Sequence, residues 1–153
     1  MLKKIITIFS FSLFLYGCEF QPIYKQNINN KININIINIL GDSSINSLIT
    51  SNLKRFSNNS SSKEYEIDIT SNYIKSEISR DTSGKVTNYR GTISVIFNIK
   101  FKDQEIKKNL KYEKNYNIKN TLNSFEQLNY ENNIKKNLTL SIVDEFLKDI
   151  LLI

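Results

Sequence analysis

Apolar and polar residues alternate in four stretches of the chain, and a period of two residues is typical of a half-buried β-strand. In each stretch one face would be buried and the other would meet water. The third stretch is the clearest, because its apolar residues alternate with polar ones from Thr92 to Lys100. The apolar positions of the four predicted strands are Ile32, Ile34 and Ile36; Tyr65, Ile67 and Ile69; Ile93, Val95, Phe97, Ile99 and Phe101; and Ile106, Leu110 and Tyr112.

The same pattern predicts where the strands bend or turn. The alternation changes phase near Tyr73 and Ile74, so a bulge or bend is expected before Ile78. The run Asp81-Thr82-Ser83-Gly84 predicts a hairpin turn, because glycine readily adopts a left-handed conformation. A second tight turn is expected at residues 102–104, before the fourth strand.

Two other stretches repeat apolar residues every three or four positions, which predicts amphipathic helices. Gly41 to Ser44 ends the first strand and offers N-cap residues for the first helix. A connecting loop from Asn117 to Asn123 is expected before the second and longer helix. The apolar positions are Ile45, Leu48, Ile49, Leu53 and Phe56 in the first helix, and Ile134, Leu138, Ile142, Phe146 and Ile150, flanked by Val143, Leu147 and Leu151, in the second.

The order of these elements predicts an α+β fold, strand-helix-strand-strand-strand-helix, with no repeat and no second domain. Two helices on one face of a four-stranded mixed sheet would bury both apolar stripes in a two-layer sandwich. A membrane-surface role for the first helix is less favoured, because only Lys54 and Arg55 are charged within it.

The opposite face of the predicted sheet is polar. Simple solvation is the commoner reason for such a face, and the alternation alone favours it. The other interpretation is docking against a wall or a water-filled lumen of another protein. The residues expected on this face are Glu66, Asp68, Thr70, Thr92, Ser94, Asn98 and Lys100.

The composition excludes most catalytic chemistry. The chain of 153 residues has no histidine and a single cysteine, Cys18. A histidine general base, a Ser-His-Asp triad, a Cys-His pair and nearly every zinc site are therefore impossible. Carboxylate chemistry remains, for example at Glu66 and Asp68, but no pair of acids lies in a recognisable catalytic frame. We expect no enzyme, no catalytic residue and no bound metal.

The N-terminus has the order of an export signal: basic residues at Lys3 and Lys4, then a short apolar run that ends at Leu15. The run is too short to span a membrane as a helix. The sequence from Leu15 to Cys18 resembles a bacterial lipobox, which implies lipidation of Cys18 and removal of residues 1–17. An ordinary signal with an incidental cysteine is the alternative. We expect residues 18–30 to form a lipidated tether and residues 31–153 a single domain.

The chain is moderately basic. It has 21 basic and 15 acidic side chains, and loss of Lys3 and Lys4 would leave a net charge of +4. A positive field suits a polyanionic partner, such as the phosphorylated head of a glycolipid. The alternative explanation of the net positive charge, favoured from charge alone, is the compositional bias toward Asn, Ile and Lys that AT-rich genomes produce. Nucleic acid is a poor candidate partner for an exported, membrane-anchored protein.

The residues that follow the lipobox point to a family. Cys18 to Tyr24 (Cys-Glu-Phe-Gln-Pro-Ile-Tyr) resembles the Cys-Gly-Phe-x-Pro-Leu-Tyr start of mature LptE, the LPS-assembly lipoprotein of Gram-negative bacteria. Ser83 to Tyr89 is similar to the Gly-x-x-x-x-Tyr hairpin of that family. The segment from Tyr116 through Asn117, Phe125, Gln127 and Glu131 to the final helix is similar to its pre-helix loop and C-terminal helix. Glu19 departs from the usual glycine, yet it is not the aspartate linked to inner-membrane retention.

The resemblance implies an outer-membrane lipoprotein on the periplasmic side. Such proteins fold as an α/β sandwich, plug the LptD β-barrel as a 1:1 partner, assist its assembly and take part in inserting lipopolysaccharide. The implied covalent group is diacylglycerol with an N-acyl chain on Cys18, with no other cofactor. Basic residues of the family are linked to lipopolysaccharide, so Arg80, Lys85 and Arg90 are the expected contacts for phosphate or barrel carboxylates; solvated turn charges are the alternative. A stand-alone lipid-anchored scaffold that binds glycolipid or peptidoglycan is the second hypothesis.

Overall fold

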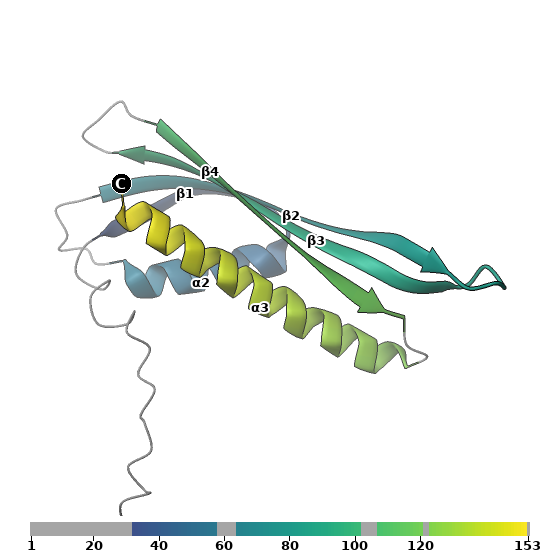
Figure 1. Ribbon diagram of the computed structural model, residues 1–153. Helices are drawn as coiled ribbons and strands as arrows, with labels where there is room; N and C mark the ends of the chain where they lie inside the picture. Colours follow the sequence, from purple (N-terminus) through teal and green to yellow (C-terminus); the bar gives the residue numbers. More distant parts are fainter. Residues whose placement is uncertain (1–31, 58–63, 102–106, 121–122, 153) are drawn as a thin grey trace, which may run out of the picture.

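The structure is a computed structural model that describes residues 32–57, 64–101, 107–120 and 123–152. Six elements follow one another along the chain (Figure 1). They are β1 (Asn33–Gly41), α2 (Ser43–Phe56), β2 (Glu64–Arg80), β3 (Val86–Phe101), β4 (Lys107–Lys119) and α3 (Ser124–Leu151). The expected signal at 1–17, the tether at 18–30 and the turn at 102–104 lie outside the described residues.

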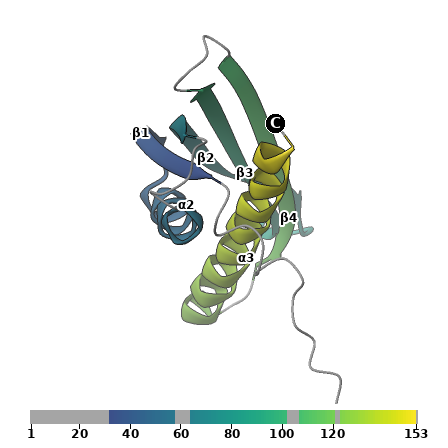
Figure 2. The same ribbon diagram turned by 90° about the vertical axis from the view of Figure 1, so that its left-hand side faces the viewer.

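The strands form one mixed sheet in the order β1-β2-β3-β4. β1 runs parallel to β2, while β2–β3 and β3–β4 are antiparallel. Both helices lie on the same face of the sheet and side by side (Figure 2). The predicted two-layer β-α-β-β-β-α sandwich is therefore confirmed.

The core lies between the helices and the inner face of the sheet. The rings of Phe97 in β3 and Phe146 in α3 are stacked with centroids 4.0 Å apart at its centre. Around them, inward residues of three strands meet the stripes of both helices, and burial of each such side chain contributes about 1.5–3 kcal/mol. The core cluster is Ile32, Ile34, Ile45, Ile49, Leu53, Tyr65, Ile67, Ile69, Ile93, Val95, Phe97, Ile99, Ile142, Val143, Phe146, Leu147 and Ile150.

β1 leaves the sheet at Gly41, and the sequence there explains why. Gly41 has a φ of +106°, and a Cβ at this position would lie 1.7 Å from the carbonyl oxygen of Ser71. Only glycine tolerates both the backbone angle and the close approach. The next residue, Asp42, is the N-cap of α2 and accepts a hydrogen bond from the Ile45 N–H at 3.0 Å. This confirms the helix start predicted from the sequence.

The hairpin tip between β2 and β3 forms at the predicted turn. The Asp81 N–H donates to the Lys85 carbonyl at 2.9 Å, and the Gly84 N–H donates to the Asp81 carbonyl at 3.0 Å. Gly84 has a φ of +84°, in the left-handed region that favours glycine.

Two local predictions are wrong. The alternation of β2 does not change phase at Tyr73 and Ile74. The register with β3 shifts instead between Glu77 and Ser79, where Ile78 is the extra residue, and again between Ser79 and Arg80. Tyr73 keeps the inward phase because its hydroxyl is hydrogen bonded to Tyr116 at 2.9 Å.

The second error concerns the end of β4. Asn117 and Ile118 were expected in a connecting loop, but β4 continues to Lys119. Asn117 pairs with Arg90 of β3, and Ile118 pairs with Tyr89. Ile118 is fully buried, and its burial explains why the strand persists over a sequence rich in asparagine.

Candidate interaction surfaces

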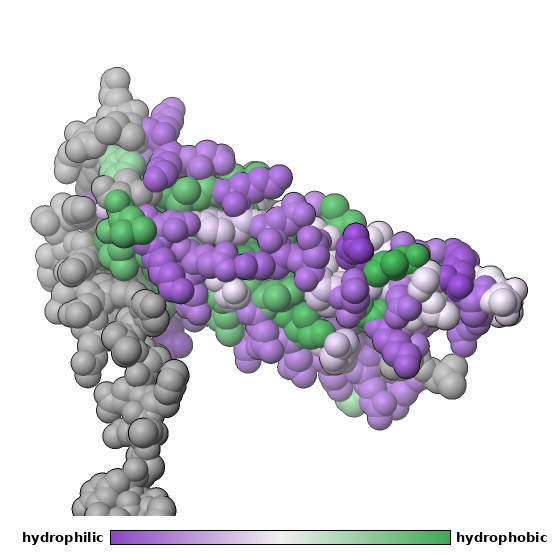
Figure 3. Space-filling model, in the orientation of Figure 1, coloured by the Kyte–Doolittle hydropathy of each residue, from purple (hydrophilic) through white to green (hydrophobic). Residues whose placement is uncertain are grey.

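The outer face of the sheet, opposite the helices, carries polar side chains. They form cross-strand pairs: the Asn109 side-chain amide donates to the Asn98 side-chain oxygen at 2.6 Å, and the Thr92 hydroxyl donates to the Asn115 side-chain oxygen at 2.6 Å. All seven residues expected on this face are half-buried or exposed, and none belongs to the core. Hydrophilic residues also cover much of the surface visible in Figure 3.

A hollow of about 430 Å³ lies at one end of this face. Its walls carry both signs of charge: Glu66 and Asp68 from β2, Lys100 from β3, and Lys107 from β4. The Lys100 ammonium lies 3.6 Å from the Glu66 carboxylate. Asp68 accepts a hydrogen bond from the Asn38 side-chain amide at 2.7 Å. The hollow can therefore donate and accept hydrogen bonds, and both of its carboxylates are engaged, Glu66 with Lys100 and Asp68 with Asn38.

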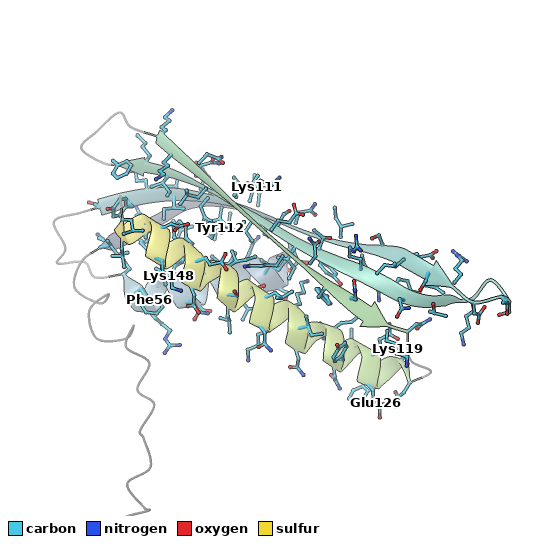
Figure 4. All side chains as sticks on the ribbon, in the orientation of Figure 1. Phe56, Lys111, Tyr112, Lys119, Glu126 and Lys148 are labelled. Atoms are coloured by element: carbon cyan, nitrogen blue, oxygen red, sulfur yellow. The ribbon has the colours of Figure 1, made fainter. Side chains whose placement is uncertain are left out.

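Positive charge is concentrated on β4, which is an edge strand. Five of its thirteen residues are lysines and one, Glu113, is acidic. Figure 4 marks Lys111 in the first half of the strand and Lys119 at its last residue. Lys114 pairs with Glu145 of α3, whereas the other four lysines, namely Lys107, Lys108, Lys111 and Lys119, are exposed and have no partner among the described residues.

The sequence analysis missed this lysine strand as a candidate site. The signal was visible, because five lysines in thirteen residues far exceed their share elsewhere in the domain. Two physical roles suit such an edge. Lysines on an edge strand prevent unwanted pairing with other strands, and a row of cations attracts phosphate or carboxylate groups.

The three expected cationic contacts do not form one cluster. Arg80 and Lys85 lie together at the hairpin tip, where the Arg80 guanidinium donates to the Gly84 carbonyl at 2.9 Å and also pairs with Glu77. Arg90 lies further along β3, between Ser76 of β2 and Asn117 of β4. By strand alternation Arg90 lies on the outer face, like Thr92 and Lys100.

The tip itself is built around Asp81. Its carboxylate accepts hydrogen bonds from the Ser83 hydroxyl at 2.6 Å and from the Ser83 and Lys85 N–H groups at 2.9 Å. These hydrogen bonds hold the pKa of the Asp81 carboxyl below its ordinary value, and the bond from the Ser83 hydroxyl has the largest effect. At neutral pH the charge of Lys85 therefore lies close to an ionised carboxylate, which reduces its attraction for an external anion.

The inner face holds polar contacts that fix α3 rather than a binding site. Burial, followed by the hydrogen bond to Asp149, raises the pKa of Tyr112 far above its ordinary value. Burial and the bond to Tyr73 do the same for Tyr116. Both phenols stay neutral at any physiological pH. Lys75 contacts Glu131 of α3 at 2.6 Å and lies over the Tyr89 ring.

Two further searches cover the described residues only. No group of three or more metal-binding side chains is found in the domain that the structure describes. Neither α2 nor α3 is long and apolar enough to cross a membrane. Cys18, the expected lipidation site, lies outside the described residues.

Comparisons with known proteins identify the fold. No family model and no curated protein matches the sequence. Among solved structures, rare lipoprotein B from Shewanella oneidensis is similar over 80% of this chain and 94% of its own, with a TM-score of 0.54 and 13% identity. Lipoprotein B from Nitrosomonas europaea is similar over 82% of this chain and 87% of its own, with a TM-score of 0.53 and 13% identity.

These likenesses confirm the resemblance stated from the sequence, at the level of the fold. They cover 80% and 82% of this chain. The chain has the fold of the LptE-family lipoproteins, the group that includes rare lipoprotein B.

Proposed function

We propose that this chain is an outer-membrane lipoprotein that plugs the LptD β-barrel, assists assembly of that barrel and takes part in lipopolysaccharide insertion. The observation that carries the proposal is the fold shared with lipoprotein B structures over most of the chain. The lipobox at Cys18 supplies the expected anchor. The proposal assigns no catalysis to the chain.

The polar outer face supports a role inside the water-filled lumen of a β-barrel. A plug must present side chains that tolerate water and that hydrogen bond to the polar inner wall of a barrel. The amide and hydroxyl pairs of the outer face, such as Asn98 with Asn109, offer such groups without exposed charge. Isolation of the partner distinguishes such a plug from a sheet that is simply solvated.

Lipopolysaccharide is the proposed anionic ligand, and the lysines of β4 extend the set of candidate contacts. Lys107 and Lys111 lie on the same side of the strand by alternation, as does Arg90 on the neighbouring strand β3. Phosphate groups bind such exposed cations in a salt-dependent way. We therefore add Lys107 and Lys111 to Arg80, Lys85 and Arg90 as proposed contacts.

Isolation of the full chain from its membrane tests the proposal. An affinity-tagged chain should retrieve a large β-barrel protein in a 1:1 ratio, and depletion should leave that barrel misassembled. The matched control is the C18S variant, which cannot be lipidated and should remain as the uncleaved precursor. Recovery of the mature lipoprotein without any barrel protein would contradict the proposed plug.

The second candidate is a stand-alone lipid-anchored binding protein for glycolipid or peptidoglycan. The lysine strand favours it, because these exposed cations do not need a barrel partner to attract phosphate. This alternative predicts that the isolated chain binds lipopolysaccharide by itself, that salt weakens the binding, and that no barrel accompanies it.

A further inference from the structure

The two edges of the described sheet differ sharply in charge and in polarity. The β4 edge carries five lysines. The other edge is formed by β1 and, where β1 has ended, by the last part of β2. Nine large hydrophobic side chains are exposed on the described domain, and none of them belongs to β4. Five of the nine belong to the second edge: Ile37, Ile39, Leu40, Ile74 and Ile78. The β4 edge presents a row of like charges, whereas the second edge combines exposed apolar side chains with charges of both signs, such as Lys75 and Glu77.

The second edge includes an open stretch of β2. The pairing of β1 with β2 ends at Gly41 and Ser71, because Gly41 turns the chain away from the sheet. From Asn72 to Arg80, β2 pairs only with β3 in the part of the chain that the structure describes. Alternate N–H and C=O groups along this stretch therefore point away from the sheet, and no strand among the described residues receives them.

The sequence of the open stretch is complementary to itself. We propose that it pairs antiparallel with the same stretch of a second copy of this chain, around a two-fold axis at Ser76. This register places Ile74 opposite Ile78 of the second copy on the outer face. It also places Lys75 opposite Glu77 of the second copy on the helix face. Directly opposite apolar pairs and opposite charges both stabilise antiparallel strands.

The local contacts are compatible with this pairing. Ile74 is 53% exposed and Ile78 is 44% exposed, so both are available to a neighbour. Glu77 already contacts Arg80, and Lys75 already contacts Glu131, so each new ion pair joins an existing network. The bulge at Ile78 limits the regular ladder to a few residues. The dimer interface is therefore small, and the dimer dissociates on dilution. It does not depend on the proposed barrel partner.

Disulfide cross-linking tests the register. Residues on the two-fold axis lie directly opposite their own copies, and opposite residues of antiparallel strands have Cα atoms about 4.5–5.5 Å apart, within disulfide range. The full chain with S76C, in detergent, should form a disulfide dimer identified by the mass of the linked peptide. The matched control is N117C, which is also an exposed outer-face position but lies on the lysine edge, and it should not cross-link.

Light scattering of the detergent-solubilised full chain tests the dimer without cross-linking. The mass should double as concentration rises, and I74K should lower the dimer fraction at least several-fold. I37K is the matched control, because Ile37 is 50% exposed on the same edge but lies outside the paired stretch. A monomer at every concentration, cross-linking no faster for S76C than for N117C, or equal effects of I74K and I37K would overturn the proposal. None of these results depends on whether a barrel co-purifies.

Discussion

Lys135 of α3 donates a hydrogen bond at 2.7 Å to Asp42, the residue that caps α2. The other carboxylate oxygen of Asp42 accepts the Ile45 N–H. One side chain thus caps the first turn of α2 and also binds α3. Lys135 also lies over the Tyr73 ring, 4.5 Å from its centroid, so the same cation connects both helices to β2.

Replacing Asp42 should reveal both roles. D42A removes the cap and the partner of Lys135, and we expect a loss of about 1–3 kcal/mol in the free energy of unfolding. D42N keeps a good capping group and loses only the ion pair, so its loss should be smaller. Chemical denaturation of both variants measures the difference. Equal losses for D42A and D42N would show that the cap contributes nothing.

The same carboxylate should make stability depend on pH. Burial alone raises the pKa of Asp42, but the hydrogen bonds from Lys135 and from the Ile45 N–H outweigh it and leave the pKa below its ordinary value. A lowered pKa in the folded state stabilises the protein above the unfolded value, about 4. That contribution is lost as the pH falls through the folded pKa.

We therefore expect the stability gap between the parent chain and D42N to be full at neutral pH. The gap should shrink progressively below about pH 4, where Asp42 becomes protonated. Urea unfolding at several pH values checks this trend. A gap that grew as the pH fell would contradict the assigned direction of the pKa shift.

A Cβ at Gly91 would lie 2.4 Å from the ring of Tyr116, so any side chain at this position forces the ring to move. We expect G91A to destabilise the fold by about 1–3 kcal/mol through overpacking. G84A is the matched control, since its Cβ would meet nothing within 4 Å and would cost only the left-handed strain of about 1–2 kcal/mol.

A double-mutant cycle separates the clash from other effects of the Gly91 change. Y116L removes the ring that the new methyl group would strike. If the clash is the cause, G91A should cost less in the Y116L background than in the parent chain. Purely additive losses, measured by thermal unfolding, would show that the destabilisation has another origin.

Charge reversal on β4 should weaken binding to an anionic ligand. K107E with K111E changes the exposed edge by four charges, and we expect roughly a tenfold loss in affinity for lipopolysaccharide at low salt. K54E with R55E makes the same change on exposed positions of α2 and should have little effect. The measurement is binding of the full chain to lipopolysaccharide at two salt concentrations; equal losses for both pairs would assign the effect to net charge alone.

The sequence by itself determined the local elements. The alternation from Ile93 to Phe101 is sufficient to specify a strand with an inward and an outward face, and this stretch forms part of β3. The stripe from Ile134 to Ile150 likewise specifies the buried side of α3. Gly41 and Asp42 mark the change from strand to helix, because a left-handed glycine and a capping carboxylate act within one turn of chain.

The candidate surfaces depended on contacts between distant residues, which a local pattern does not contain. The polar face was predictable, since alternation assigns it. That β4 is an edge, so that its lysines form an exposed row, follows only from strand order. The sequence grouped Arg80, Lys85 and Arg90 by their nearness along the chain, whereas the fold separates Arg90 from the tip.

Tertiary structure also decided where the strands end and bend. Asn117 belongs to β4 because Arg90 lies opposite, and Ile78 bulges because the register with β3 shifts there. The free edge of β2 exists only because Gly41, thirty residues earlier in the chain, turns away beside Ser71. Periodicity fixes which face a residue takes, but pairing and register are set by long-range packing, and these determine which parts of the molecule remain available to a partner.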